Sequence, residues 1–494
     1  MSGPRRSTLA IFIAAGVLFG LLATANGAGY RYGVSDQAFY IPVVERSLDS
    51  SLFPRDASLI DAQGHLMALD EILATLAIAT GLPLEILYLW GYLLSLALVW
   101  AGIVLIGTRV YSSRWALVAL GAVLTLRHRI PETSANSLEP YFHPRMLAFG
   151  LGLLAVAALL RRRSWMAVAL VAVAAPVHVT TALWFAVLIG VALATLDVRM
   201  RRLGIVGGIV AAVLLATAAI AGPLSGTLTI MDDEWLQAVA SKDSLFATAW
   251  PVWAWAANLG TFALLYWAQR TRRGRGQSTK EDEALLWGAA ALVGVFLVTL
   301  PFVAARVALP VQFQISRVFW LIDFLATVYL IGAVADSPTR RTQAMAIAAV
   351  LVAFAIGRGS YVMLVERPER GLFDVRLVDS PWEDAMRWIR SQPRDVHVLA
   401  DPGHAWKYGT SVRVAAERDV FLEEVKDSAI AIYSRDVAVR VVDRTRDIED
   451  FSTLTDERAL DLARRYDLDF LVSEADIPLP VLYSNRQFRI YDLR

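Results

Sequence analysis

Long apolar segments separated by short polar connections fill most of the chain up to Ile356. A helix needs about 20 apolar residues to cross a bilayer, and many of these segments approach that length. We therefore predict about eleven transmembrane helices, the first of them retained rather than cleaved as a leader. The longer segments are 8–25, 84–107, 203–221, 249–267, 284–304 and 318–335, and the shorter ones are 115–126, 146–160, 165–177, 179–196 and 344–356.

Clusters of arginine predict the orientation of these helices, because basic loops stay in the cytoplasm. Placing every cluster inside puts the N-terminus in the cytoplasm and the C-terminus outside. The segment 67–82 then has the wrong parity to cross, and we expect a surface-lying or re-entrant outer helix there. The larger polar segments gather on the outer face, where we expect function to lie. The clusters are Arg5-Arg6, 161–163, 199–202, 270–275 and Arg340-Arg341.

The sequence changes character after residue 357. Residues 1–357 are predicted to form a membrane domain whose first outer loop is 26–65, and residues 358–494 a small extracytoplasmic α/β domain. Ser380-Pro381 is typical of a helix start, and it precedes a predicted helix over 382–390. Further helices are expected over 425–444 and 456–466, and strands over 396–400, 470–473, 481–483 and 488–491.

Composition agrees with a membrane protein and excludes several classes of function. Hydrophobic residues make up 56% of the chain and charged residues 19%, and the mean hydropathy is +0.49. A net charge of +1 gives no field that would attract nucleic acid. The chain has no cysteine, which rules out disulfides and thiolate chemistry. Lysine occurs only four times, and this arginine bias is typical of GC-rich bacteria, so we expect a bacterial inner membrane.

The first outer loop carries the most informative carboxylates. Asp36 follows the first apolar segment by about ten residues, which keeps it near the membrane surface. A carboxylate there could take a proton from an acceptor hydroxyl while a lipid-borne donor lies in the bilayer. The alternative is that Asp36 caps a short helix running to Leu48. Asp56 is a second acidic candidate in the same loop.

Cationic side chains occur next to several apolar segments on the predicted outer side. His143 and Arg145 could bind a phosphate or pyrophosphate, or could anchor the chain at the interface. His178, at the tip of a tight hairpin, could donate to a phosphate or sugar, or could be structural. Arg317 could neutralise a leaving phosphate, or could pair with Asp323 two turns further on.

The order of parts resembles the GT-C superfamily of membrane glycosyltransferases, through the segments 33–37 and 52–56. The resemblance implies a polyprenyl-phosphate-linked sugar donor and transfer on the extracytoplasmic side. It implies that Asp36 is the catalytic carboxylate and that Asp56 is a second acidic position. Many relatives carry paired acids in this loop, whereas Gln37 follows Asp36 here. The sequence therefore does not support a divalent cation, and it leaves the cofactor open.

The resulting hypothesis is a polytopic helical membrane protein of GT-C-like architecture that transfers a sugar from a polyprenyl phosphate to a glycan, lipid or protein acceptor. Asp36 would act as general base, His143, Arg145 and Arg317 would hold the departing phosphate, and His178 would orient the sugar or phosphate. A lipid or solute transporter is the main alternative, and a catalytically inactive scaffold is a third. No Walker A, GxSxG or HExxH motif occurs.

Overall fold

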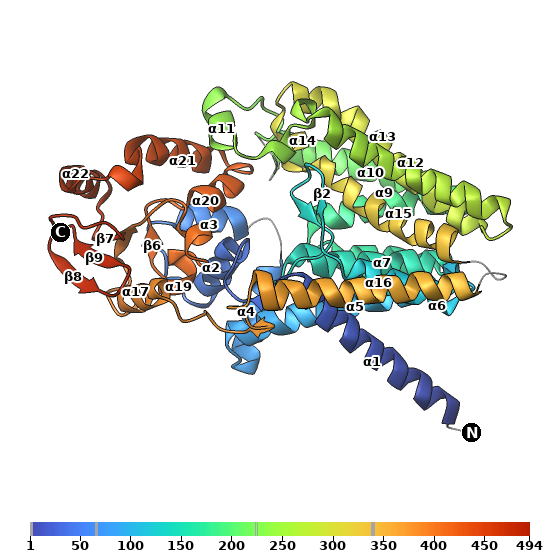
Figure 1. The fold of residues 1–494 in the computed structure, drawn as a ribbon. Coiled ribbons are helices and arrows are strands. Elements are labelled where there is room, and N and C mark those ends of the chain that lie inside the picture. The colour runs from blue at the N-terminus through green and yellow to red at the C-terminus, as the bar shows by residue number, and fades with distance from the viewer. Residues whose placement is uncertain (1–2, 65–67, 223, 225, 337–340) are drawn as a thin grey trace. The chain divides into compact units, whose positions relative to one another are not determined.

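The structure is a computed structural model that describes residues 3–64, 68–222, 224, 226–336 and 341–494 (Figure 1). It divides into two compact units, each built from three separate stretches of the chain. The first unit comprises Met1–Tyr30, Trp90–Ile230 and Asp243–Phe373. The second comprises Arg31–Leu89, Met231–Lys242 and Asp374–Arg494. The sequence places the start of an extracytoplasmic domain after residue 357, and this boundary stays a prediction.

The first unit is a bundle of helices, and each of the predicted apolar segments lies on one of them. The helices pack in pairs, α9 against α13, α12 against α15, α7 against α8 and α6 against α16. The helices are α1 (Gly3–Asn26), α5 (Leu84–Val110, mostly in this unit), α6 (Arg114–Leu124), α7 (Pro144–Leu160), α8 (Ser164–Ala174), α9 (Val179–Leu196), α10 (Val198–Ala221), α12 (Val252–Gly274), α13 (Lys280–Ala304), α15 (Val318–Ala335) and α16 (Arg341–Tyr361).

Seven helices of the described chain are long and apolar enough to cross a membrane. Three more, α6, α7 and α8, are apolar but shorter. Along α10 only Ala219 is buried, so its apolar side chains face outward, as lipid-facing residues do. The chain is therefore a polytopic helical membrane protein, while the predicted number of crossings and the orientation of the termini stay predictions.

The second unit combines short helices from the first loop with a small α/β fold from the C-terminal segment. Its five-stranded sheet has the order β6-β5-β7-β9-β8, with β5 parallel to β6 and β7, and β9 antiparallel to β7 and β8. The strands are β5 (His397–Leu399), β6 (Asp419–Val420), β7 (Phe470–Ser473), β8 (Val481–Ser484) and β9 (Arg489–Asp492). The predicted α/β character of this segment is thus confirmed.

The helices of the second unit depart from the prediction at one point. The expected helix over 425–444 is two helices, α20 (Glu424–Ala431) and α21 (Arg435–Ile448), because Ser434 begins a new helix by accepting a hydrogen bond from the backbone N–H of Val437. The remaining helices are α2 (Gln37–Leu48), α3 (Ala57–Gly64), α4 (Leu69–Thr80), α11 (Asp233–Ala238), α17 (Pro381–Arg390), α18 (His404–Lys407), α19 (Val412–Ala416) and α22 (Asp456–Tyr466).

The predicted outer helix over 67–82 corresponds to α4, although residue 67 lies outside the described residues. Gly81 ends α4 in the left-handed conformation, which suits glycine. Ile72, Leu76 and Ile78 are exposed along α4. An apolar exposed face is typical of a helix that lies at a membrane surface. The position of α4 relative to a membrane stays a prediction.

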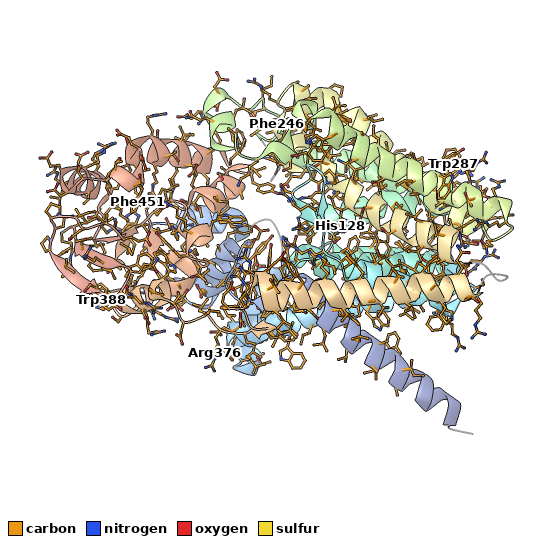
Figure 2. The ribbon with its side chains drawn as sticks, viewed as in Figure 1. His128, Phe246, Trp287, Arg376, Trp388 and Phe451 are labelled. Carbon is orange, nitrogen blue, oxygen red and sulfur yellow. The ribbon has the colours of Figure 1, made fainter. Side chains whose placement is uncertain are left out.

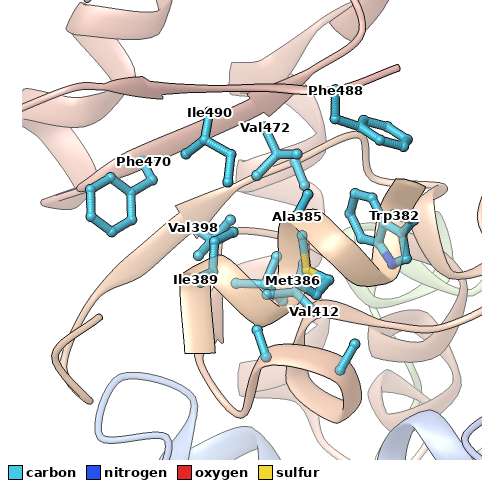
Figure 3. Packing of buried hydrophobic residues seen from close by; sticks show 14 of the residues in the cluster. Trp382, Ala385, Met386, Ile389, Val398, Val412, Phe470, Val472, Phe488 and Ile490 are labelled. Carbon is cyan, nitrogen blue, oxygen red and sulfur yellow. The ribbon is translucent and has the colours of Figure 1, made fainter. Parts of the chain in front are cut away.

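A hydrophobic core under the sheet holds the second unit together (Figure 3). Along α17, Trp382, Met386 and Ile389 are buried on one face, at the spacing of an amphipathic helix. They meet Phe470 and Ile490 from the strands β7 and β9. The predicted cap is confirmed, since the Ser380 hydroxyl accepts from the backbone N–H of Glu383 at 3.2 Å.

Candidate active site

Asp36 lies at the start of α2, but its carboxylate does not cap that helix. Its Oδ1 instead accepts a hydrogen bond from Lys426 Nζ at 2.8 Å, and 29% of the Asp36 side chain is exposed. The helix expected to run to Leu48 is thus present with Asp36 at its N-cap position, but the expected side-chain capping bond is not formed. A partly exposed carboxylate that is held by a lysine is accessible to a substrate, whereas a cap carboxylate would be committed to the backbone.

Two lysines that sequence reasoning missed surround this carboxylate. Lys426, on α20, is 5% exposed, and its ammonium lies over the rings of Phe39 at 6.0 Å and Trp406 at 5.8 Å. Lys242 follows α11 and donates to the backbone oxygen of Val425 at 2.8 Å. Burial, helped by the charge of Lys426, lowers the pKa of Lys242 to about 8, against the opposing effects of Asp36 and Glu424. The available signal was rarity, since half of the chain's four lysines occur here.

The short helix α11 places Lys242, and ion pairs hold α11 in the second unit. Asp232 caps α11 by accepting from the backbone N–H of Trp235 at 2.9 Å, and it pairs with Arg435 at 2.6 Å. The Trp235 indole donates to the backbone oxygen of Ala431 at 2.7 Å. The position of Lys242 beside α20 therefore depends on contacts that are local to this unit.

The charges around Asp36 do not fit a divalent cation. A metal site of this kind needs several oxygen ligands, usually from more than one carboxylate. Asp36 pairs with the ammonium group of Lys426 at 2.8 Å and interacts electrostatically with that of Lys242, and both positive charges would repel a cation. Across the described part of the chain, no group of three or more His, Asp or Glu residues is arranged to hold a metal ion.

Asp56 is fully buried in a network of ion pairs. Its carboxylate accepts from Arg413 Nε at 2.7 Å, from Arg440, and from the backbone N–H of Val420 at 3.2 Å. Burial alone would raise the pKa of Asp56, but the two arginines outweigh it and hold that pKa well below its usual range. Arg413 also forms a two-pronged pair with Asp427, at 2.6 and 3.1 Å. The geometry favours a structural role for Asp56.

The same network contains a further carboxyl group, that of Glu423, which within the described part of the chain has no arginine of its own to pair with. Glu423 lies 3.8 Å from Arg413, but that guanidinium is already bound by Asp56 and Asp427, and neither Glu423 side-chain oxygen has a hydrogen-bond partner in the described residues. Burial therefore dominates and raises the pKa of Glu423 to about 8, despite the opposing charge of Arg413. At neutral pH this group is mostly protonated.

Replacing Glu423 by Gln is expected to flatten the pH dependence of stability. Because the folded-state pKa is raised, the stability that Glu423 contributes is complete below its ordinary value of 4.5 and is lost as pH rises through about 8. Asp419, whose pKa burial raises to about 6, acts in the same direction at lower pH. Above pH 8, Glu423→Gln should therefore unfold at a higher temperature than wild type, and its free energy of unfolding should be larger by a few kcal/mol. Thermal unfolding between pH 4.5 and 9 measures this, with the exposed neighbour Glu424→Gln as control; parallel curves for wild type and Glu423→Gln would contradict it.

In the first unit, three helices begin at predicted phosphate-binding residues. His143 precedes α7, His178 precedes α9, and Arg317 precedes α15. The imidazole rings of His143 and His178 lie 6.2 Å apart. Burial lowers the pKa of His178 well below its usual value, and the positive charges of His143, Arg317 and Arg145 add to this effect. Helix N-termini carry partial positive charge, so this cluster is suited to an anion.

Capping fixes which ring nitrogen each histidine presents. His143 Nδ1 accepts from the backbone N–H of Arg145 at 3.1 Å. His178 Nδ1 accepts from the backbone N–H of Thr181 at 3.3 Å and lies 3.0 Å from its hydroxyl. Because Nδ1 is the acceptor, the proton of a neutral ring sits on Nε2. His178, whose pKa is lowered, can thus donate a hydrogen bond from Nε2 while remaining neutral.

Arg145 is more firmly engaged than the prediction assumed. It is 2% exposed, donates from Nη2 to Glu139 at 2.7 Å, and lies over the Trp320 ring at 5.6 Å. Glu139 also has Arg127 at 3.7 Å. Arg145 therefore already has a carboxylate partner, and it can act on a ligand mainly through its field.

Asp323, the expected partner of Arg317, pairs with a histidine instead. His128 is labelled in Figure 2. Its Nε2 lies 3.1 Å from Asp323 Oδ2, and its Nδ1 lies 3.2 Å from the backbone oxygen of Leu126. The hydrogen bond to Asp323 raises the pKa of His128, against the effect of burial. The carboxylate that falls in a predicted membrane span is thus paired with His128, which lies between α6 and α7.

The candidate residues divide between the two units. The cluster of His143, His178, Arg317 and Arg145 belongs to the first unit, and Asp36 and Asp56 belong to the second. Within the second unit, Asp36 faces lysines and aromatic rings, whereas Asp56 lies in the arginine network.

Comparison with known proteins gives similarity only among solved structures. No family model matches the chain, and neither does any curated protein. The oligosaccharyltransferase of Archaeoglobus fulgidus is similar in its apo form, with a TM-score of 0.45, 12% identity, and coverage of 94% of this chain and 69% of that one. The same enzyme tethered with an acceptor peptide gives a TM-score of 0.41, 14% identity, and the same coverage.

The arabinofuranosyltransferase AftD from Mycobacteria is also similar, with a TM-score of 0.48 and 15% identity. The match covers 98% of this chain but 40% of that one, so the chain spans less than half of that enzyme's length. Both names are those of glycosyl-transferring enzymes. Because the TM-scores and identities are low, the functional proposal rests on the residues of this chain.

Proposed function

We propose that the chain is a GT-C-like glycosyltransferase that moves a sugar from a polyprenyl phosphate to an acceptor on the extracytoplasmic side of a bacterial inner membrane. The observation that carries this proposal is the meeting of His143, His178 and the positive charge of Arg317 at the starts of membrane-domain helices. Such a cluster, in an apolar bundle, suits the phosphate of a membrane-borne lipid.

The cluster would act on the leaving group. As the bond between the anomeric carbon and the phosphate oxygen breaks, negative charge grows on the phosphate. Arg317 and the Nε2–H groups of His143 and His178 would stabilise that charge, and such preorganised donors give a large part of enzymatic rate enhancement. Neutral His178 would donate without needing to gain a proton first.

Asp36 would act on the acceptor. Its carboxylate would take the proton of the acceptor hydroxyl while that oxygen forms a bond to the anomeric carbon and the polyprenyl phosphate leaves as the anion. Direct displacement would invert the anomeric configuration. Lys426, hydrogen-bonded to Asp36, would hold the carboxylate in place. The acceptor would be a glycan, lipid or protein.

The transporter alternative is less well supported. Transporters place their substrate groups near the membrane midplane, often at interrupted helices. The charged groups singled out here precede helices rather than interrupt them. Purified protein in nanodiscs, supplied with a panel of polyprenyl-phosphate sugars and cell-envelope acceptors, should release polyprenyl phosphate. Passage of intact lipid-linked sugar across a vesicle membrane, without cleavage, would contradict the proposal.

Substitution of His178 separates its capping role from its catalytic one. Asn is an excellent N-cap but lacks an atom at the position of Nε2, so His178→Asn should keep the helix start and lose the donor. We expect sugar transfer to fall by about 10- to 100-fold, the effect of losing a hydrogen bond to a charged group. Gln can place a donor near the Nε2 position but caps poorly, so His178→Gln should retain more activity while losing about 1 kcal/mol of stability.

Steady-state transfer rates and thermal unfolding of both variants measure these effects. Faster transfer by His178→Asn than by His178→Gln would show that the capping function, not the Nε2 donor, is the one that matters.

A further inference from the structure

Four distant stretches of the chain bring unlike side chains together around Asp36 in the second unit. Asp36 comes from the first loop, Lys242 from the segment that follows α11, Trp406 from α18 and Lys426 from α20. Figure 1 shows α2 and α20 within this unit. In a chain that uses arginine for almost all of its positive charge, two of its four lysines meet here. The proposed role of Asp36 as a base explains neither Lys242 nor Trp406.

Among the described side chains that interact here, two ammonium groups accompany one partly buried carboxylate, Asp36, and one exposed carboxylate, Glu424. Lys426 is hydrogen-bonded to Asp36 at 2.8 Å, and the charge of Lys242 interacts with both. Glu424 is the other acid that influences Lys242, and its side chain is exposed to solvent, which screens it. Asp36 is paired with Lys426, whereas Lys242 donates to the backbone oxygen of Val425 rather than to a carboxylate, so the charge of Lys242 can attract an anion.

Trp406 supplies a flat apolar surface next to the charge. It is 67% exposed, although its ring lies 5.8 Å from the buried ammonium of Lys426. A large exposed aromatic side chain beside fixed polar groups is typical of a binding surface. The apolar face of a sugar ring can stack on such an indole while its charged substituent reaches a lysine.

We propose that Lys242, Lys426 and Trp406 bind a saccharide that carries an anionic group, either a phosphate or a carboxylate. The inference rests on the proposed function and deepens it, because it assigns an anionic saccharide as the acceptor whose hydroxyl meets Asp36. The ammonium groups bind the anion, and the indole stacks on the ring. Binding itself involves no covalent step.

The pKa of Lys242 gives this site a pH dependence. Lys242 is charged below about pH 8 and loses its charge above it. Affinity for an anionic saccharide should therefore fall as pH rises through that value. The groups that set the value are Lys426, Asp36 and Glu424. Arginine stays charged throughout this range, so Lys242→Arg should bind with little change between pH 7 and 9.

The test measures binding of glucuronate, glucose 6-phosphate, glucose and inorganic phosphate to the full chain in nanodiscs by calorimetry. Wild type should bind the two anionic sugars at least about tenfold more tightly than glucose or phosphate, a factor that corresponds to one good interaction. Lys242→Gln should lose that preference, and Trp406→Ala should weaken both anionic sugars. Lys407→Gln is the matched control, because Lys407 neighbours Trp406 on α18 but pairs with Asp401.

Several outcomes would overturn the inference. Equal affinity of wild type for glucose and glucose 6-phosphate, or no saccharide binding at all, would exclude an anionic-saccharide site. Inorganic phosphate binding as tightly as glucose 6-phosphate would leave a simple anion site. Loss of saccharide binding when phosphatidylglycerol replaces neutral lipid in the nanodisc would assign the lysines to a lipid headgroup.

Failure of the proposed function gives a different result. Binding of anionic sugars without any transfer from polyprenyl-phosphate donors would support the anionic-saccharide site and contradict the proposed glycosyltransferase activity. Transfer to neutral acceptors without binding of anionic sugars would contradict the anionic-saccharide site and support the proposed glycosyltransferase activity.

Discussion

Asp36→Asn is expected to lower the rate of sugar transfer by about 10²- to 10⁴-fold, the usual contribution of a general base. Asn has the same shape as Asp, and its side-chain oxygen can still accept from Lys426, but it is neutral and cannot take up a proton. Release of polyprenyl phosphate from a lipid-linked sugar, followed under single-turnover conditions, measures the effect. Equal rates for wild type and variant would exclude Asp36 as the base.

Two controls separate chemistry from folding in this experiment. Because 29% of the Asp36 side chain is exposed and it makes no capping bond, Asp36→Asn should lose less stability than Asp56→Asn, whose side chain is completely buried. Donor binding, which we assign to the cationic cluster of the first unit, should also persist in the variant. A variant that unfolds early, or that no longer binds donor, would point to a structural role for this carboxylate.

Asp56→Asn, only 20 residues further along the chain, is expected to have the opposite profile. Asp56 is completely buried, and its charge balances Arg413 and Arg440. Removing one partner of a buried ion pair leaves an uncompensated charge and costs about 3 to 5 kcal/mol. The second unit should therefore unfold at a markedly lower temperature, while any protein that remains folded keeps its transfer rate per molecule.

Asp61→Asn is the matched control for Asp56→Asn. Asp61 lies on the short helix α3, which follows Asp56 directly. It pairs with Arg46 at 3.1 Å, but its side chain is 53% exposed. An exposed pair contributes at most about 1 kcal/mol. Limited proteolysis and thermal unfolding compare the two variants. Equal stability losses would contradict the assignment of Asp56 to a buried structural network.

Sequence patterns gave most of the fold, because helices are determined locally. The apolar segments, the cap at Ser380 and the amphipathic spacing of α17 can all be recognised within a few residues. The wrong prediction of a single helix over 425–444 also came from a local pattern. Its apolar pattern continues through Ser434, but the hydroxyl of that residue offers the backbone a new helix start.

The candidate site was only partly predictable, because its contacts join distant positions. Asp36 stands out by its place after the first span, yet its partner Lys426 is 390 positions away, and no local pattern connects the two. Asp56 was a second acidic candidate in the sequence, because its burial and the arginines that surround it become visible only in three dimensions. His143 and His178 were found from their positions before apolar segments, but their capping bonds, and hence the nitrogen each presents, required the structure.

The discontinuous second unit has a consequence for biogenesis. Residues 31–89 and 231–242 leave the ribosome long before 374–494, which supply the sheet and Arg413. Until the last stretch is synthesised, Asp56 has no guanidinium partner, and α11 lacks the α20 and α21 helices that hold it. Maturation of this unit must therefore wait until translation is nearly finished. For the same reason the C-terminal stretch, if produced alone, would carry Arg413 without one of its two carboxylate partners and should be difficult to obtain as a stable fragment.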